Sequence, residues 1–416
     1  MLKEQVVNFL KKNERIHEDF RMGVSFGHFL VSREDLKAIP YSGENGIESL
    51  LEYLTRNDWE GIYEEDALIG VQKGNATVLL GAGGQVEFHV AKTDSLKVVD
   101  KAYLDFLHCL GSELESRKQL LLSVGYQPVS KVSEIETVPM AKAKLLEEAL
   151  KDDPAALQQL KGTAKTVVTL DYAHSDDFEK KYRVVHALAP AFAVLLDNVP
   201  TLDGTPYKDF VAGIKISNEM KTPLAQVSSI VTAHSFKYAQ YANFVGECPA
   251  VAMVEGDKVV ATDKTNSEVY DDIDVNDDMI AGVLDMVMPE IKVTKEGIEL
   301  HCVDALPYPL NMAYVGLVKG LIYSPDHLNA LIQFVDNISA ETQDEIRKAV
   351  VKTGMETKFN ESLIKELSKD LYFMATPELP EGERHYTQPL DAIIFKNICP
   401  KEITRRQLTS VVDGQI

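Results

Sequence analysis

The sequence predicts an α+β fold, with antiparallel strands and many helices in one large domain. Short β-type segments follow one another between residues 68 and 90, long helical patterns dominate after about residue 175, and no repeat or clean linker divides the chain. Consecutive strands joined by glycine turns pair antiparallel, whereas a regular alternation of strands and helices would indicate a parallel sheet. A chain of 416 residues can bury about three quarters of its surface, so its core needs no disulfide or metal.

The expected elements of the first half follow from changes in hydrophobic period. Apolar residues recur at helical spacing in 2–20 and 46–57, and then alternate in short runs separated by glycine turns. The elements that follow, up to residue 197, are strands 68–72, 76–80 and 85–90, a helix over 96–117, a strand over 120–124, a helical region over 140–160, a strand over 165–172 and a helix over 176–197.

The second half is expected to be mostly helical. A helix over 223–245 precedes a hairpin over 246–262, with Glu255-Gly256-Asp257 at its turn. The acidic stretch 271–278 is expected to be a solvated loop or a helix entry; a metal site there is less favoured because the EF-hand spacing is absent. Helices dominate over 307–374. Residues 1–375 are therefore expected to form the domain, with a loop-rich, proline-interrupted tail over 376–416 packed on it.

The charge balance excludes several classes of partner. The 43 Lys and Arg residues against 64 Asp and Glu residues give a net charge of −21, which repels nucleic acids and anionic membranes. The first twenty residues carry charges inside their only apolar run, and no stretch approaches 18 apolar residues, so we expect a soluble cytoplasmic protein. The four cysteines lie far apart without a CxxC pair, which favours reduced, packed thiols over a zinc or redox site.

A glycine-rich stretch, Gly81-Ala82-Gly83-Gly84, follows an apolar strand and superficially suggests a dinucleotide-binding loop. Such a loop needs a helix after the glycines, whose N-terminal amides bind phosphate. The alternation of residues 85–90 instead predicts a second strand. We therefore expect a hairpin turn or bulge here.

Three groups of residues resemble a known family. In chain order they are Gly83-Gly84-Gln85-Val86-Glu87; Gly125-Tyr126-Gln127-Pro128 with Pro139-Met140-Ala141-Lys142-Ala143-Lys144; and Thr169-Leu170-Asp171-Tyr172 with Lys180-Lys181-Tyr182-Arg183. Their order and spacing resemble the plant and proteobacterial type of glutamate–cysteine ligase, in which the stretches read approximately PGGQFE, GFQP with PMPKGRY, and VNLDY with KKFR. The resemblance covers about residues 20–370 and marks the chain as a divergent member.

The resemblance implies a glutamine synthetase-like fold, in which a curved antiparallel sheet forms a trough for nucleotide and metals. It also implies the family reaction of glutathione biosynthesis, the ATP-dependent joining of the glutamate γ-carboxylate to the cysteine amine. That reaction requires carboxylates that hold Mg²⁺ against the phosphates, because Mg²⁺ prefers oxygen ligands. It also requires cations that stabilise the transferring phosphoryl group. ATP and Mg²⁺ are thus the implied cofactors if the chain is active.

The sequence departs from the family where metal ligands are expected. The family begins its first strand with GxExE, which places two carboxylates on one strand face. The matching positions here are Ser25 and Gly27, and a third acidic position falls on Gly81. Of the four carboxylates expected in these stretches, only Glu87 remains, as a weak candidate metal ligand or as a polar hairpin residue.

The phosphate-facing positions also differ. A family arginine falls on Lys144, and a lysine cannot form the bidentate contact that arginine makes with phosphate. A family glutamine and asparagine fall on Val167 and Thr169, and two further arginines fall on Ala212 and His301. The losses therefore cluster on the faces that would contact ATP, metal and substrate, while the apolar framework persists.

The remaining candidates for a substrate or nucleotide pocket are Gln85, Lys142, Lys144, Lys165 and Arg183. The lysines are candidates for an anion pocket or else solvated surface residues. Arg183 matches a family arginine, but it is equally placed to pair with an acidic neighbour four residues back on its helix.

Two histidines are considered as replacements for the lost carboxylates. His28 and His89 could form a transition-metal site, since imidazole suits Zn²⁺ or Ni²⁺ better than Mg²⁺. Histidines on strands are more often hydrogen-bonded structural residues, which is the simpler interpretation here.

These observations leave three functional hypotheses. The first is a non-catalytic or repurposed member that binds a small amino acid or a protein partner. The second is an active ATP- and Mg²⁺-dependent ligase with metal ligands at other positions, for example Glu64, Glu65 or Glu87. The third is a different small-molecule enzyme that uses His28 and His89. No catalytic residue is assigned, and formation of a homodimer stays open.

Overall fold

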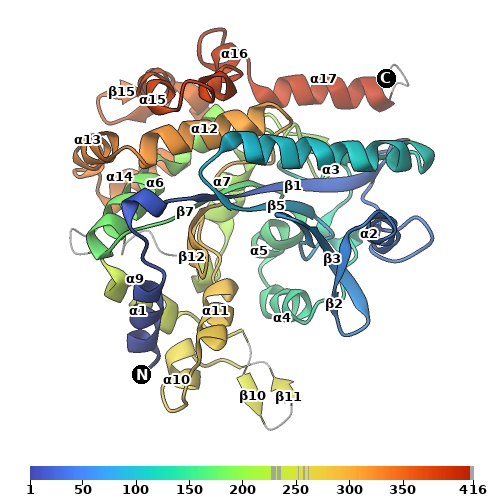
Figure 1. The fold of residues 1–416 in the computed structure, drawn as a ribbon, viewed down its shortest axis with the longest axis horizontal. Coiled ribbons are helices and arrows are strands. Elements are labelled where there is room, and N and C mark those ends of the chain that lie inside the picture. Colours follow the sequence, from blue (N-terminus) through green and yellow to red (C-terminus); the bar gives the residue numbers. More distant parts are fainter. Residues whose placement is uncertain (226–230, 232–235, 252, 256–257, 261, 413–416) are drawn as a thin grey trace.

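The computed structural model describes residues 1–225, 231, 236–251, 253–255, 258–260 and 262–412 (Figure 1). Within these residues, nine strands form one antiparallel sheet in the order β12-β13-β7-β1-β5-β4-β3-β2, with β6 paired to the far end of β1. These strands are β1 Met22–Ser32, β2 Glu60–Glu64, β3 Ala67–Lys73, β4 Ala76–Leu80, β5 Val86–Thr93, β6 Gln119–Leu122, β7 Thr166–Leu170, β12 Ile291–Thr294 and β13 Gly297–Leu300. The α+β prediction with an antiparallel sheet is confirmed.

Helices cover both sides of the sheet. Figure 1 shows α3 and α12 crossing one side, with α15, α16 and α17 beyond them, and α4, α5 and α11 on the other. The helices are α1 Leu2–Lys12, α2 Ile47–Thr55, α3 Leu96–Ser116, α4 Ala141–Leu150, α5 Pro154–Leu157, α6 Ser175–Leu195, α7 Ala212–Glu219, α9 Tyr238–Glu247, α10 Asn266–Tyr270, α11 Asp277–Met286, α12 Leu310–Ile322, α13 Pro325–Val335, α14 Ala340–Thr353, α15 Ile364–Glu378, α16 Leu390–Ile394 and α17 Pro400–Val412. Three small two-stranded sheets lie outside the main sheet. They are β8 Thr201–Leu202 with β9 Thr205–Pro206, β10 Met253–Glu255 with β11 Lys258–Val260, and β14 Lys358–Phe359 with β15 Ser362–Leu363.

The long helix α3 packs on the sheet through one apolar stripe. Its buried residues Val99, Tyr103, Phe106 and Leu110 are spaced by four, three and four positions, which places them on one face of a helix. The Tyr103 ring lies 4.7 Å from the ring of Phe26 on β1, in an edge-to-face arrangement. This side of the sheet is therefore filled by large side chains.

Several expected elements are confirmed with shifted boundaries, and some expectations are wrong. The first helix ends at Lys12 rather than near residue 20, and a short 3₁₀ turn, His17–Asp19, follows it. The hairpin β12–β13 was not expected, since only helices and loops were predicted after residue 262. Residues 226–230 and 232–235 of the expected helix over 223–245, and the turn residues 256–257, lie outside the described residues.

The tail after residue 376 is helical rather than loop-rich. α15 continues through Pro377, and α16 and α17 follow. α17 is held on the loop after α6 by a buried ion pair 2.8 Å long between Lys401 and Asp197. Thr404 also donates a hydrogen bond of 2.6 Å to Asn198. These non-local contacts stabilise a helix that its local pattern does not predict.

Two further expectations concern the surface of the fold. The acidic stretch 271–278 leads into α11. The N-cap residue of this helix, Asn276, accepts a hydrogen bond of 2.9 Å from the backbone N–H of Met279. In the described part of the chain, no helix is both long and apolar enough to cross a membrane.

Candidate functional site: a charged trough under the sheet

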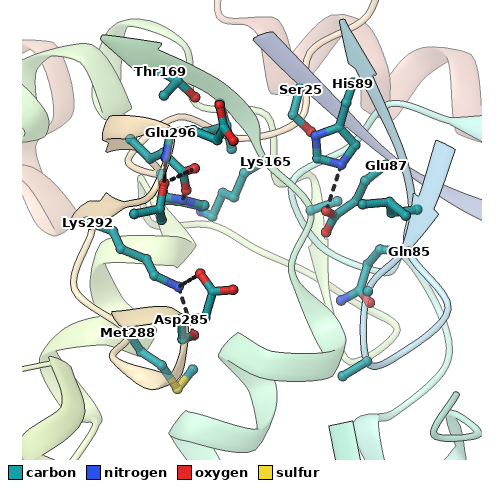
Figure 2. Close-up of a pocket in the computed structure, with 18 of the residues that line it drawn as sticks. Ser25, Gln85, Glu87, His89, Lys165, Thr169, Asp285, Met288, Lys292 and Glu296 are labelled. Atoms are coloured by element: carbon teal, nitrogen blue, oxygen red, sulfur yellow. Dashed lines mark hydrogen bonds and ion pairs between the residues drawn. The ribbon is translucent and has the colours of Figure 1, made fainter. Parts of the chain in front are cut away.

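A cavity of about 970 Å³ lies on the side of the sheet opposite α3. Its floor is formed by β7, β1 and β5, and its walls by α4, the segment 285–290 and the hairpin β12–β13. Figure 2 shows Ser25, Gln85, Glu87 and His89 on one side of this cavity and Lys165, Lys292 and Asp285 on the other. The predicted trough is thus formed by the predicted central strands and one unpredicted hairpin.

The strand register fixes the arrangement of the floor. Ser25 on β1 lies directly between Val167 on β7 and His89 on β5. Two residues further along β1, Gly27 pairs with Glu87 on one side, and its N–H donates a hydrogen bond of 2.8 Å to the carbonyl of Lys165 on the other. Since side chains alternate between the faces of a strand, these residues all face the trough.

A side chain at two of the glycines, Gly27 and Gly81, would contact neighbouring atoms closely. A Cβ atom at Gly27 would lie 3.0 Å from both the backbone N and O of Lys165. A Cβ atom at Gly81 would lie 2.6 Å from Oε1 of Gln85, closer than real Cβ contacts. A carboxylate at either position would require the neighbouring strand or side chain to move.

Gln85 fastens the glycine turn to the segment before β7. Its Oε1 accepts a hydrogen bond of 2.8 Å from the N–H of Gly83, and its Nε2 donates to the carbonyls of Leu160 and Thr163 at 3.1 and 3.0 Å. The side chain is buried, and its amide oxygen and nitrogen are both engaged within the protein. Gln85 thus lines the cavity, but the hydrogen bonds of its amide group are formed with the protein backbone.

Glu87 and His89 form the polar edge of the floor. Nε2 of His89 lies 3.5 Å from Oε2 of Glu87 and has no hydrogen-bond partner among the described residues. Mg²⁺ prefers near-octahedral coordination by oxygen atoms. The floor offers one carboxylate and the neutral hydroxyl of Ser25, and the described residues contain no group of three or more His, Cys, Asp or Glu suited to a metal ion. The residues of the floor do not fit this cation.

The opposite wall carries two lysines that approach one carboxylate. Lys142 on α4 lies 3.8 Å from Oδ2 of Asp285, and Lys292 on β12 lies 3.9 Å from Oδ1. The ammonium of Lys292 also donates a hydrogen bond of 2.9 Å to the carbonyl of Asp285. Burial and the nearby charge of Lys142 lower the pKa of Lys292 to about 8.

Other charged residues of the trough are paired more closely. Lys165 lies 3.2 Å from Oδ1 of Asp304, whose Oδ2 accepts a hydrogen bond from the backbone N–H of Asn198. Glu299 accepts a hydrogen bond of 2.9 Å from His301. Burial by itself would raise the pKa of Glu299, but the hydrogen bond and charge of His301 lower it to about 2.

The carboxylate of Glu290 is also held within the protein. Arg347 donates two hydrogen bonds to it, at 2.6 and 2.8 Å. Burial opposes ionisation of Glu290, yet the charge of Arg347 keeps the pKa of this carboxyl below its usual value.

Comparison with known proteins finds sequence similarity to glutamate–cysteine ligases. No protein-family model matches the chain. The chloroplastic glutamate–cysteine ligase of Solanum lycopersicum is 24% identical over 97% of this chain and 79% of its own length. Glutamate–cysteine ligase A of Oryza sativa subsp. japonica is 22% identical over 97% of this chain and 84% of its own length. The chain is a divergent relative of the glutamate–cysteine ligases.

A solved structure supports the same fold. The crystal structure of glutamate–cysteine ligase from Francisella tularensis in complex with AMP aligns over 96% of this chain and 88% of its own, with a TM-score of 0.57 and 10% identity. The predicted ligase-like fold is therefore confirmed, although the sequences have diverged widely.

The structure places some of the family-derived candidates in the trough and others outside it. Ser25, Gly81, Gln85, Glu87, Lys142 and Lys165 line the cavity. Lys144 lies on the exposed side of α4, because residues two apart on a helix point in different directions. Arg183 is buried in α6 and pairs with Asp336 at 3.0 Å and Glu179 at 3.5 Å, so it contributes to helix packing outside the trough.

The hypothesis of a metal site shared by His28 and His89 is wrong. His28 lies on the opposite face of the sheet, where its Nδ1 donates to the carbonyl of Val86 at 3.0 Å and its Nε2 accepts from the hydroxyl of Tyr103 at 2.8 Å. Burial lowers the pKa of His28 to about 4, so the ring is neutral at pH 7. It is a structural histidine, the simpler of the two interpretations.

The alternative ligand positions Glu64 and Glu65 also lie outside the cavity lining. Oε1 of Glu64 accepts a hydrogen bond of 2.6 Å from the N–H of Ala141, at the start of α4. Glu65 occupies the turn between β2 and β3, with a positive φ of 52°.

Sequence reasoning missed the acidic and basic residues of the β12–β13 wall. Lys292 and Glu299 face the cavity from the two strands of this hairpin, and Gly297 begins the second strand with a φ of +131°. The alternating polar and apolar residues of 291–300, interrupted by a glycine, are typical of a hairpin and were the available signal.

Proposed function

We propose that this relative of the glutamate–cysteine ligases does not efficiently catalyse the Mg²⁺- and ATP-dependent ligation and instead acts as a binding or regulatory protein. The observation that carries this proposal is the floor of the trough. Of the four positions where the family resemblance implies a carboxylate, three hold Ser25, Gly27 and Gly81. At the two glycines, an added Cβ atom would lie 3.0 Å or less from neighbouring atoms.

The physical argument concerns charge compensation. A triphosphate carries several negative charges, and a trough lined with carboxylates binds it only when Mg²⁺ neutralises both partners. A floor with only Glu87 and a neutral hydroxyl lacks the anionic oxygens that would hold the cation in place. Activation of a carboxylate by phosphoryl transfer would then lack its main electrostatic stabilisation.

The trough nevertheless supports binding of a small molecule. Its volume of about 970 Å³ is at the upper end of ordinary ligand sites. Ammonium groups line one wall and the Glu87 carboxylate lies on the other side. Such a distribution suits a small charged compound such as an amino acid, and the occupied trough could in turn be recognised by a protein partner.

One observation favours a second candidate function, an active ligase with relocated metal ligands. Asp285, Glu290, Glu296 and Glu299 line the same cavity from the β12–β13 side. This alternative requires a metal to replace existing partners, because Glu290 is bound by Arg347 and Glu299 by His301. We therefore rank it below the binding role.

The direct test is turnover by the purified full-length protein. It is incubated with ATP, Mg²⁺, glutamate and each of the common amines, cysteine included, and phosphate release is measured beside an active glutamate–cysteine ligase. We expect release at the background level. Release that requires Mg²⁺ would overturn the proposal and support the ligase. Loss of this release in Glu87→Gln would indicate a metal on the floor of the trough, and its persistence would favour ligands on the β12–β13 side.

A further inference from the structure

Two lysines in the trough are not fully paired. Lys142 and Lys292 come from different elements, α4 and β12, and both approach the carboxylate of Asp285. Their distances of 3.8 and 3.9 Å are ion-pair distances but are too long for hydrogen bonds. The wall therefore presents two ammonium groups to a single carboxylate.

Most N–H groups of these two ammonium groups form no hydrogen bond with the described residues. Each ammonium has three N–H donors. Lys292 uses one in its hydrogen bond to the Asp285 carbonyl, and among the described residues no hydrogen bond is formed by Lys142. The side chain of Lys292 is only 14% exposed, so water alone has limited access to its remaining donors. Two like charges with spare donors at the edge of a cavity favour an additional anion between them.

Two other lysines in the trough, Lys165 and Lys92, are less available. Lys165 is only 11% exposed and pairs with the buried Asp304 at 3.2 Å. Lys92 lies 2.6 Å from Asp171. An incoming anion would have to break these contacts, whereas at Lys142 and Lys292 it would compete only with the longer contacts to the Asp285 carboxylate.

We propose that Lys142 and Lys292 form a metal-independent site for an oxyanion, either a phosphate or a carboxylate group of a small molecule bound in the trough. The inference rests on the proposed function, because it assigns to lysine side chains the neutralising role that Mg²⁺ would have in a working ligase. Asp285 separates the two ammonium groups and competes with the ligand for them. The depressed pKa of Lys292 agrees with this arrangement, since a bound anion would stabilise its protonated form.

The test is isothermal titration calorimetry of the full-length protein in EDTA at pH 7, with inorganic phosphate, ATP and glutamate as separate probes. We expect at least one probe to bind, and its identity tells a phosphate from a carboxylate ligand. Lys142→Gln and Lys292→Gln should each weaken that binding at least tenfold. Lys101→Gln is the matched control, because Lys101 is 76% exposed on α3 and pairs with Asp105, and it should leave the affinity unchanged.

Asp285→Asn gives the sharpest result, because the inference predicts a gain. Removal of the competing carboxylate should tighten anion binding at least threefold, whereas a purely structural Asp285 would leave it unchanged or weaken it. Lys142 is 46% exposed, so its variant is expected to fold, and thermal unfolding checks this.

The inference is overturned if none of the three probes binds in EDTA, or if a probe binds equally well to the wild type and to folded Lys142→Gln. Its failure is distinguishable from failure of the proposed function. Anion binding in EDTA together with Mg²⁺-dependent turnover would support the lysine site and refute the proposed binding role. Absence of both anion binding and turnover would refute the lysine site and leave the proposed lack of catalysis standing.

Discussion

The two faces of β1 have opposite character. Toward α3 the strand presents Phe26 and His28, which are buried against the ring of Tyr103, and both ring nitrogens of His28 are hydrogen-bonded. Toward the trough it presents Gly23, Ser25 and Gly27, which leave a shallow floor between charged neighbours. One face of the strand thus packs in the core, and the other carries the small residues of the trough floor.

The largest expected effect is on the packed face. Phe26→Ala should lower the free energy of unfolding by about 3–5 kcal/mol, because it removes a fully buried ring that contacts Tyr103. Ser25→Ala, one residue away on the trough face, should cost less than about 1 kcal/mol. Urea denaturation of both variants measures the contrast, and equal losses would show that the two faces do not differ as described.

The next largest effect is expected at Gln85, whose side chain lines the trough but forms hydrogen bonds only within the protein. Its substitution tests whether this residue stabilises the fold or binds a ligand. Gln85→Leu should lower the free energy of unfolding by about 2–3 kcal/mol, because the Gly83 N–H and the Leu160 and Thr163 carbonyls lose their partner. The matched control is Gln72→Leu, since Gln72 donates one exposed hydrogen bond to Glu60. A loss no larger than in this control would reassign Gln85 to ligand binding.

Restoring bulk to the trough floor should be unfavourable. Gly27→Ala should lower the free energy of unfolding by about 1–3 kcal/mol, because its Cβ would press on the backbone of Lys165 at 3.0 Å. Gly111→Ala, on the open side of α3 with no atom within 4 Å of the added Cβ, is the control and should be neutral or stabilising. If Gly27→Ala were equally well tolerated, the floor could accept a carboxylate side chain after all.

The smallest effect concerns the pH dependence contributed by His28. Its pKa falls from 6.5 to about 4 on folding because of burial. Between these values the unfolded state binds the extra proton, so stability rises with pH and is lost as the pH falls from about 6.5 toward 4. His28→Gln should reduce this slope by up to about 1.4 kcal/mol for each pH unit.

Chemical denaturation at several pH values measures this slope. His17→Gln, at an exposed histidine on the 3₁₀ turn, should leave it unchanged. An unchanged slope in His28→Gln would mean that the His28 ring is not held neutral in the fold.

Much of the sheet could be predicted from the sequence. The short β-type runs 68–72, 76–80 and 85–90 indicated three adjacent strands, and a helix was predicted over 96–117, where α3 lies. The trough floor followed from the family resemblance, since β1 itself has a nearly continuous apolar pattern with two glycines. The strands β12 and β13, of four residues each, were missed although the alternation over residues 291–300 was available.

The site was only partly predictable, for a different reason. The outward position of Lys144 relative to Lys142 follows from helix geometry and was available. The ion pair of Lys165 with Asp304 joins residues 139 positions apart, and the pair of Lys292 with Asp285 depends on an unpredicted hairpin. These two pairs decide which cations remain free for a ligand. The first is long-range and the second requires the hairpin to be known, so local patterns reveal neither of them.

The most direct measurement of the central claim is Mg²⁺-dependent phosphate release from ATP in the presence of glutamate and cysteine. The account predicts no release above background, for the wild type and for Glu87→Gln alike. Steady release by the wild type that stops in EDTA would contradict it, whether or not Glu87→Gln abolishes that release.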